Sequence, residues 1–298
     1  MKNNRLKFDK HIILSCTLLL SAGIIAAQQS NSLRNEISVY MNGGISYLKY
    51  DMDMDVKQDG RLGGGLGVQY ALYLSSNWSV SAGAEYQQYH SETTFSDFEG
   101  YYPTTDSEGE DFEFRSSASS YQEKQMLDML NIPLRIQYET TGKPTRFFAS
   151  TGIQWGIPVQ TKYKVTATDL KTAGYYEQYD ALLESPAFVG FGNWGTEVKD
   201  NRKLDIKNSF SLLFDLGIKQ QIKENEDLYI GLYAEFGLNE LNKESSPSKE
   251  LISYDTENPT EFQFESITNA SPGGQGKVYA DKLKTIGFGL KVRYTLPW

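Results

Sequence analysis

Hydrophobic and polar residues alternate at every second position over several stretches of this chain. Residues 228–238 alternate without a break, with Leu228 and Ile230 on one face and Tyr229 and Gly231 on the other. A β-strand points successive side chains to opposite sides of a sheet, so this pattern predicts strands with one apolar face and one small or polar face. Eight segments follow it: 36–50, 61–74, 78–90, 130–139, 146–159, 209–222, 228–238 and 285–298.

The connections between these segments are alternately long and short. The sequence places them at 51–59, 75–77, 91–120, 140–145, 160–207, 223–227 and 239–281. Outer-membrane barrels have short periplasmic turns and longer extracellular loops. We therefore predict an all-β fold, an eight-stranded antiparallel up-and-down transmembrane β-barrel with both chain ends on the short-turn side. In this prediction 91–120 is an acidic loop, and 160–207 is irregular with a short helix near 175–184.

The N-terminus has the pattern of a secretory signal peptide. Four basic residues, Lys2, Arg5, Lys7 and Lys10, precede the apolar run HIILSCTLLLSAGIIAA, which is too short for a membrane helix. We expect residues 1–27 to be removed after Ala27, leaving a short segment, 28–35, and a barrel domain, 36–298. A lipid anchor at Cys16 is disfavoured because few apolar residues precede it.

Charge and cysteine content narrow the possible chemistry. Residues 1–27 carry four basic residues against Asp9, so their removal changes the formal net charge from −9 to −12. A chain this acidic is a poor binder of nucleic acid. Cys16 is the one cysteine, so the mature chain is expected to contain no disulfide and no thiol nucleophile.

Alternation alone does not separate a membrane barrel from a lipocalin-like soluble barrel, which buries its apolar face. The signal peptide, strands of about ten residues or more, and a polar face rich in small residues favour the membrane. The chain end adds a resemblance to the C-terminal signal of outer-membrane barrels, carried by Leu290, Val292, Tyr294, Leu296 and Trp298. It implies the barrel-assembly machinery and outer-membrane lipid as partners, and a location in the cell outer membrane.

Three internal stretches carry a further resemblance. LNIPLRIQY (130–138), FDLGIKQQI (214–222) and LYIGLYAEFGLNEL (228–241) resemble strands of the PorT-like outer-membrane β-barrel family of Bacteroidota. The resemblance implies the eight-stranded architecture of OmpA- and OmpX-like barrels and brings no catalytic residue. That family is named for a secretion and gliding component, and most of its members have no assigned activity.

If the apolar faces meet lipid, seven charged residues point into the barrel. They are Glu85, Arg135, Asp215, Lys219, Glu235, Lys291 and Arg293. Eight strands leave an interior that side chains fill, and buried charges must pair, so we predict that the three acids contact the four bases. A proton or ion path is the rival interpretation.

No stretch carries a strong catalytic, metal or cofactor signal. Some eight-stranded barrels are lipid-modifying enzymes that depend on histidine, but His90 and Ser91 are adjacent in a strand and point to opposite faces. EGEDFEF (108–114) lacks the spacing of a calcium loop, and GRLGGGLG (60–67) sits in a strand, where glycine permits close packing. We therefore predict no catalytic residue, no cofactor and no metal.

One long connection is rich in aromatic residues. SPAFVGFGNWG (185–195) places Phe188, Phe191 and Trp194 either at a contact surface or within a packed loop cluster. The function we predict is a structural or surface-interaction barrel with a filled lumen and an unknown extracellular or envelope partner. A small-solute pore or secretion-associated component is the alternative, followed by a lipid-modifying enzyme.

Overall fold

The computed structural model describes residues 34–52, 56–242, 250–274 and 278–297. Eight antiparallel strands close into a ring. They are β1 (Asn35–Met52), β3 (Leu62–Tyr73), β4 (Trp78–Thr105), β5 (Asp111–Glu139), β6 (Thr145–Tyr176), β9 (Ser209–Lys223), β10 (Glu226–Gly237) and β13 (Ala280–Thr295). Each ring strand pairs with its sequence neighbour, and β1 pairs with β13, so the topology is up-and-down. The eight predicted strands are therefore the eight strands of the ring.

The full sheet is larger than predicted, because it contains 11 strands. β2 (Lys57–Gly60) pairs with β4, while β7 (Ala181–Leu183) and β8 (Gly192–Arg202) both pair with β6. At one end of the ring the connections are short, at 74–77, 140–144 and 224–225, and Arg34 and Leu296 lie at the same end.

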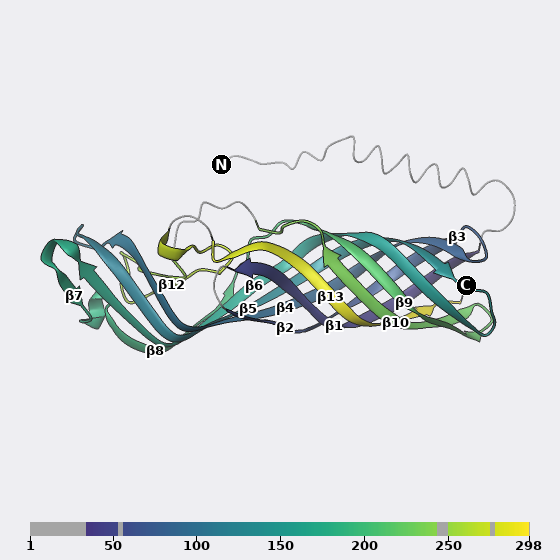
Figure 1. Cartoon of the computed structure of the whole chain (residues 1–298), viewed down its shortest axis with the longest axis horizontal. Coiled ribbons are helices and arrows are strands. Elements are labelled where there is room, and N and C mark those ends of the chain that lie inside the picture. The colour runs from purple at the N-terminus through teal and green to yellow at the C-terminus, as the bar shows by residue number, and fades with distance from the viewer. Residues whose placement is uncertain (1–33, 53–55, 243–249, 275–277, 298) are drawn as a thin grey trace, which may run out of the picture.

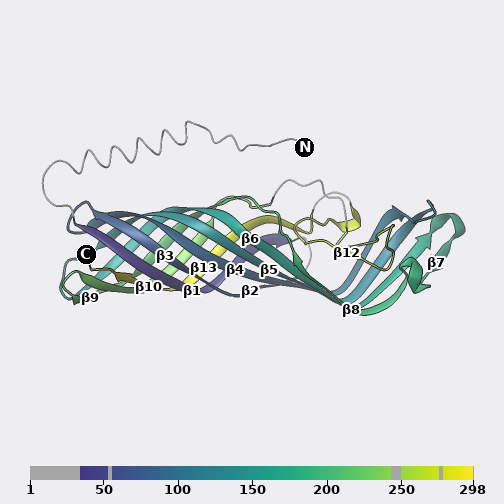
Figure 2. The same ribbon diagram turned by 180° about the vertical axis from the view of Figure 1, so that it is seen from behind.

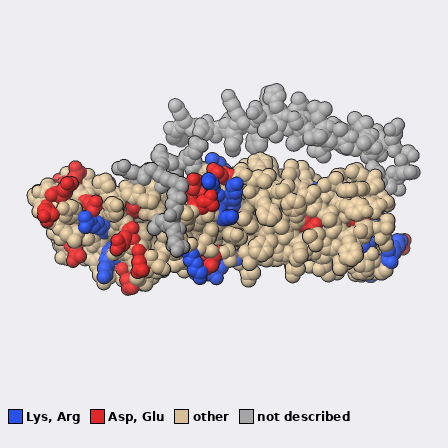
Figure 3. Space-filling view, in the orientation of Figure 1, with Lys and Arg blue, Asp and Glu red and all other residues tan. Residues whose placement is uncertain are grey.

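The outer face of the ring is apolar. The large side chains that point outward include Leu66, Leu216, Leu232 and Leu290, which are 62%, 58%, 53% and 61% exposed. On the side seen in Figure 3, this surface is almost free of charge and lies between charged residues at mid-molecule and at the far end. No helix among the described residues is long and apolar enough to cross a membrane.

Three strands continue far beyond this apolar surface. Figures 1 and 2 show β4, β5 and β6 running from the ring into a projection that carries β7 and β8, which we call the extension. The prediction of an acidic loop at 91–120 is therefore wrong, since only 106–110 connects β4 to β5. The prediction that 160–207 is irregular is also wrong, because most of it belongs to β6, β7 and β8. The short helix expected near 175–184 is present as a 3₁₀ helix, Glu177–Tyr179, between β6 and β7.

The alternation of side chains breaks at one level in three neighbouring strands, where the sheet enters the far part of the extension. The ladder between β4 and β5 leaves Asp97 and Ser119 unpaired, and that between β5 and β6 leaves 118–119 and 169–170 unpaired, with the same register on both sides of each gap. Asp97 and Asp169 have φ of 51° and 53°, and the Ser119 hydroxyl donates to Asp169 at 2.8 Å. On β4, Phe95 and Phe98 are consequently both buried, although they are three residues apart.

The concave side of the extension is covered by the chain between β10 and β13. This segment, 250–274, holds the two-stranded sheet of β11 (Ile252–Ser253) and β12 (Gln263–Phe264) and ends in the 3₁₀ turn Pro272–Gly274. Its apolar residues pack with those of β4, β5 and β6 in one cluster. Phe114, for example, is fully buried against Tyr254 and Phe262. The extension is thus a folded body with its own apolar core.

Candidate functional site

The ring interior holds all seven charged residues predicted to face it. They are buried, with exposed fractions between 2% for Lys219 and 7% for Arg135 and Lys291. The same strands carry apolar residues outward, because alternation forces the two sets onto opposite faces. The structure thus places the seven residues on the polar face.

Asp215 on β9 is the centre of one ionic group. Its Oδ2 lies 3.2 Å from Arg135 Nε and 3.2 Å from Lys291 Nζ, and it accepts a hydrogen bond from Ser150. Arg135 also approaches Glu85 at 3.8 Å, and Glu85 accepts a hydrogen bond of 2.7 Å from Tyr40. These contacts join strands β1, β4, β5, β6, β9 and β13 across the interior.

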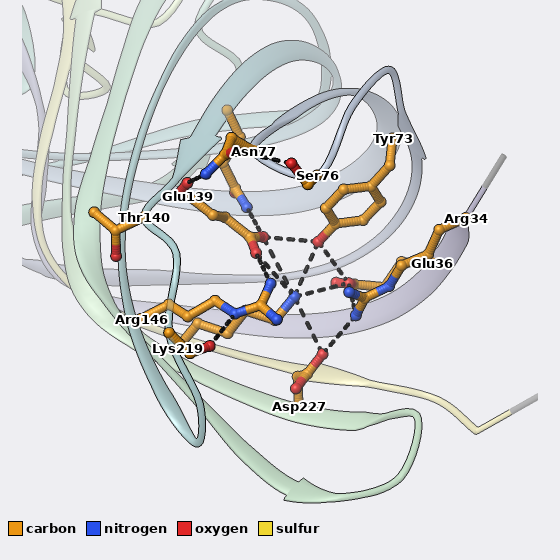
Figure 4. Close-up of polar contacts among 12 residues, drawn as sticks. Arg34, Glu36, Tyr73, Ser76, Asn77, Glu139, Thr140, Arg146, Lys219 and Asp227 are labelled. Carbon is orange, nitrogen blue, oxygen red and sulfur yellow. Dashed lines mark hydrogen bonds and ion pairs between the residues drawn. The ribbon is translucent and has the colours of Figure 1, made fainter.

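A second group lies at the end of the ring with the short turns (Figure 4). The Lys219 ammonium is 3.3 Å from Glu36, 3.2 Å from Glu139 and 3.1 Å from Asp227. Arg146 pairs with Glu139, and Arg34 pairs with Asp227 at 3.0 Å. The acids that hold Lys219 are not the ones predicted for it, since none of these three was expected to face inward.

The alternation of the strands, extended by two residues, would have identified Glu36, Glu139 and Asp227 as residues that face inward. Glu36 and Glu139 lie two positions beyond residues already assigned to the polar face, Ser38 and Gln137, and Asp227 lies two before Tyr229. They sit where the apolar runs end, so the sequence pattern assigned them to strand ends and turns.

Aromatic side chains complete the interior. The Arg293 guanidinium lies 3.6 Å from the centre of the Tyr229 ring and donates to Gln137 at 2.9 Å. Tyr229 and Tyr73 both donate to Glu36 and Glu139. A cation over an aromatic face is stabilised without a counter-charge, which explains how Arg293 stays buried without a close acid.

Glu235 departs from the prediction that every interior acid contacts a base. Within the described residues it forms no ion pair. It accepts hydrogen bonds from Tyr89 at 2.8 Å and from Ser211 at 2.8 Å. Tyr89 belongs to the apolar cluster that continues into the extension. Beyond Glu235 the buried side chains become mainly apolar, with Tyr89, Leu127 and Met129 fully buried, and Ser91, Thr93 and Gln125 are buried among them.

The interior is filled. The cavity beside Asp215, Lys291 and Arg293 has a volume of about 10 Å³, which is at the lower limit for one water molecule. Close packing also explains Gly67 on β3, because a Cβ at this position would lie 2.4 Å from the Tyr40 ring. The glycine-rich segment 60–67 thus makes room for interior side chains.

The predicted contact residues of 185–195 separate into two kinds. Phe188 is 74% exposed, whereas Phe191 is buried against Phe112 and Tyr254. Trp194 is half-buried, packs on Phe262 and donates to Thr172 at 2.7 Å. Phe191 and Trp194 are therefore packing residues, and Phe188 alone remains available for contact.

Exposed apolar residues gather around Phe188 in the sequence, at the far end of the extension. We call Tyr179, Leu182, Leu183 and Phe188 the tip patch; their exposed fractions are 63%, 47%, 41% and 74%. Solvent-exposed apolar groups in such a cluster are typical of contact surfaces.

The comparisons with known proteins agree with this architecture. Residues 26–241 match the family described as an outer membrane protein beta-barrel domain. The chain belongs to this family. It is an outer-membrane β-barrel protein and resides in the cell outer membrane.

More distant comparisons give little detail. No curated protein matches the barrel. Among solved structures it is similar to Neisserial surface protein A, with a TM-score of 0.34 and 8% identity over 88% of this chain and 99% of that one. It is also similar to the translocator domain of the autotransporter NalP from Neisseria meningitidis, with a TM-score of 0.22 and 10% identity over 97% and 96% of the two chains.

The end of the barrel sequence and the candidate chemistry can now be located. Leu290 lies exposed on β13 and Leu296 lies exposed just after it, with Val292 and Tyr294 half-buried between them, while Trp298 lies outside the described residues. His90 Nδ1 lies 3.0 Å from the Leu62 carbonyl, and Ser91 is buried on the opposite face.

The candidate calcium stretch 108–114 forms a turn and the start of β5. The described part of the chain contains no group of acidic, histidine or cysteine side chains arranged to hold a metal.

Two acids of the barrel are buried in the extension, beyond the apolar surface. Glu123 is fully buried and accepts hydrogen bonds from Ser266 at 2.7 Å and the Ile267 amide at 2.9 Å. Burial raises its pKa to about 7. Glu250 accepts from the Leu251 and Gly273 amides and from Tyr279, and burial raises its pKa as well. Glu123 thus holds segment 250–274 against β5, and Glu250 joins the two ends of that segment to each other and to Tyr279.

Proposed function

We propose that this barrel is a non-conducting, non-enzymatic surface protein whose extension meets a partner outside the cell. The observation that carries the proposal is the division between the filled ring and the folded extension. The ring interior is occupied by ion pairs and capped by apolar side chains, which supports a structural role for it. The extension ends in the exposed tip patch, which supports a role in contact.

Orientation follows from the lengths of the connections. Short turns and both ends of the described chain lie at one end of the ring, and the extension lies at the other. Outer-membrane barrels keep their short turns in the periplasm. The extension is then extracellular, and the Lys219 group closes the periplasmic end.

A finer assignment rests on sequence alone. The resemblance of 130–138, 214–222 and 228–241 to PorT-like barrels of Bacteroidota supports a secretion-associated component as the second candidate. These stretches form parts of β5, β9 and β10 and the residues that follow β10. A role in secretion predicts that deletion of the protein retains secreted proteins in the periplasm, which fractionation of the culture would measure.

Orientation can be tested by labelling single cysteines on intact cells. Cys16 lies within the expected signal peptide, so a Phe188→Cys variant carries one mature thiol. We expect a membrane-impermeant maleimide to label it. A matched Ser76→Cys variant in the turn at 74–77 should be labelled only after the outer membrane is permeabilised. The opposite pattern would place the extension in the periplasm.

Conduction can be tested on the purified protein in planar lipid bilayers. We expect no discrete conductance steps from the wild type, because ion-paired and aromatic side chains occupy the ring interior. Regular steps that scale with protein concentration would replace this proposal with the small-solute pore.

A further inference from the structure

The outer face of the extension carries a groove of about 700 Å³. It lies on the face opposite the apolar core, across β4, β5 and β6. Two rows of neighbouring residues cross its floor, Glu99, Ser117 and Lys171 in one, and Tyr101, Arg115 and Ala173 in the other. The row between them, Gly100, Ser116 and Thr172, faces the core. Small side chains at Ser117 and Ala173 thus leave room between long ones.

The groove contains several charged side chains, and their charges nearly balance. Arg115 and Lys171 line it together with Glu99, Glu113 and Glu184. A strongly anionic ligand would meet the three carboxylates, and a cation would meet the two bases, so neither is favoured. Ionised acids accept hydrogen bonds and the bases donate them, so the groove offers both kinds of partner to a neutral hydroxylated ligand.

The central polar group is held in place. Arg115 pairs with Glu113 at 2.7 Å and lies over the Tyr175 ring, 4.7 Å from its centre. A side chain already fixed by two contacts loses little conformational entropy when it binds. Asn193, paired in the ladder with Lys171, adds an amide that can both donate and accept.

The groove also has apolar surface. Tyr101 is 62% exposed and Leu182 is 47% exposed, and both line the groove. An apolar peptide would also cover the charged side chains beside them, which is costly because they would lose water without gaining hydrogen-bond partners. The face of an exposed aromatic ring suits a ligand with one apolar face and hydroxyl groups around its edge.

We propose that this groove binds a neutral oligosaccharide. The sugar ring stacks its CH face on Tyr101, and its hydroxyl groups exchange hydrogen bonds with Arg115, Lys171 and the surrounding carboxylates. This inference rests on the proposed function, because it requires the extension to face the outside of the cell. It goes beyond that function by assigning the ligand class and by placing the site in a groove that meets the tip patch at Leu182.

The test is isothermal titration of the purified full-length barrel in a detergent without a sugar head group. The probes are cellohexaose, maltohexaose, xylohexaose and mannohexaose, with hexagalacturonate as the anionic comparison. We expect one-site binding of at least one neutral hexasaccharide. Tyr101→Ala should weaken it by about tenfold, since one aromatic contact of this kind contributes that much. Arg115→Ala should weaken it as well.

Tyr179→Ala is the matched control. Tyr179 is 63% exposed, against 62% for Tyr101, and belongs to the tip patch. The Tyr179→Ala variant should bind the sugar with the affinity of the wild type. Absence of binding by all four neutral probes, binding of hexagalacturonate alone, or equal affinity of Tyr101→Ala and wild type would each overturn the inference. The thiol labelling and conductance results do not involve sugar, so they test the proposed function separately.

Discussion

Along β5, Arg135 and Asn131 face the interior of the ring, whereas Leu127, Tyr121 and Phe114 face the interior of the extension. Within the 29 residues of β5, the apolar face therefore points outward in the ring and inward in the extension. In the ring the outer side chains meet lipid, so the apolar residues face outward and the polar ones are enclosed. In the extension the outer side chains meet water, and the apolar residues are enclosed. The surrounding solvent decides which face of an alternating strand becomes its core.

The enclosed polar groups make the ring sensitive to the loss of one charge. Asp215→Ala leaves Arg135 and Lys291 without their shared carboxylate. We expect this to lower the free energy of unfolding by about 3–5 kcal/mol, the cost of an uncompensated buried charge. Urea titration in lipid vesicles would measure it. Glu108→Ala, in the exposed turn between β4 and β5, is the control. Equal stability of the two variants would mean that water compensates the interior charges.

The extension should instead be sensitive to the loss of apolar volume. Phe114 is fully buried against Tyr102, Tyr254 and Phe262. Phe114→Ala should destabilise the extension by about 3–5 kcal/mol. Limited proteolysis should then cut 250–274 faster, while the ring keeps its heat-modifiable mobility on gels. Phe188→Ala, at the exposed tip patch, should change neither. Loss of the ring in the Phe114 variant would show that the two regions fold as one unit.

The outer faces of the ring and of the extension can be compared by introducing an arginine into each. Leu232 on β10 and Val198 on β8 are 53% and 47% exposed. Leu232→Arg should cost about 2–4 kcal/mol, since it places a charge in the bilayer. Val198→Arg, on a water-facing surface, should change the stability by about 0.5 kcal/mol or less. Unfolding in vesicles measures both. Similar costs would show that the face of β10 does not meet lipid.

The smallest expected effect is a pH dependence confined to the extension. The pKa of Glu123 is raised when folded, to about 7, so its stabilising contribution is present at low pH and is lost as the pH rises through 7. Hydrogen exchange in 250–274, corrected for its intrinsic rate, should accelerate by up to about tenfold per pH unit between pH 5 and pH 7, and by about twofold at most between pH 7 and pH 8.

Glu123→Gln separates this effect from a general one. The substitution removes the titratable carboxyl group but keeps a carbonyl oxygen that accepts a hydrogen bond from the Ile267 amide. Most of the pH dependence should therefore disappear. Glu250, whose pKa is also raised, accounts for what remains. A pH dependence of equal size in the Gln variant would assign the titration to another group.

The ring could be predicted from the sequence because lipid surrounds it, so the apolar face of every ring strand points outward. Each ring strand keeps its apolar face outward, so parity located residues as far apart as Glu85 and Arg293 in one interior. The individual pairs could not be predicted in the same way. They depend on which strands face each other across the ring, and this is why Lys219 contacts Glu36 rather than the acids expected.

Two local features of the sequence explain why the extension was not predicted. Its apolar face points inward, so 91–120 shows charges where the ring strands show apolar residues, and the sequence suggests a solvated loop. The unpaired residues Asp97, Ser119 and Asp169 then interrupt the alternation. The packing of Phe191 was hidden for a different reason, because its partner Tyr254 lies 63 positions away in the sequence.

The unbroken course of β4, β5 and β6 fixes the height of the extension. From Gln88, near the upper limit of the apolar surface, β4 runs to Thr105 without a break in the strand. At about 3.3 Å per residue this is a contour of about 55 Å. A flexible linker would let the tip patch sample many distances from the bilayer, whereas paired strands hold it at one. Under the proposed function the extension would act as a rigid stalk, and lengthening or shortening β4, β5 and β6 together would set how far from the membrane a partner is met.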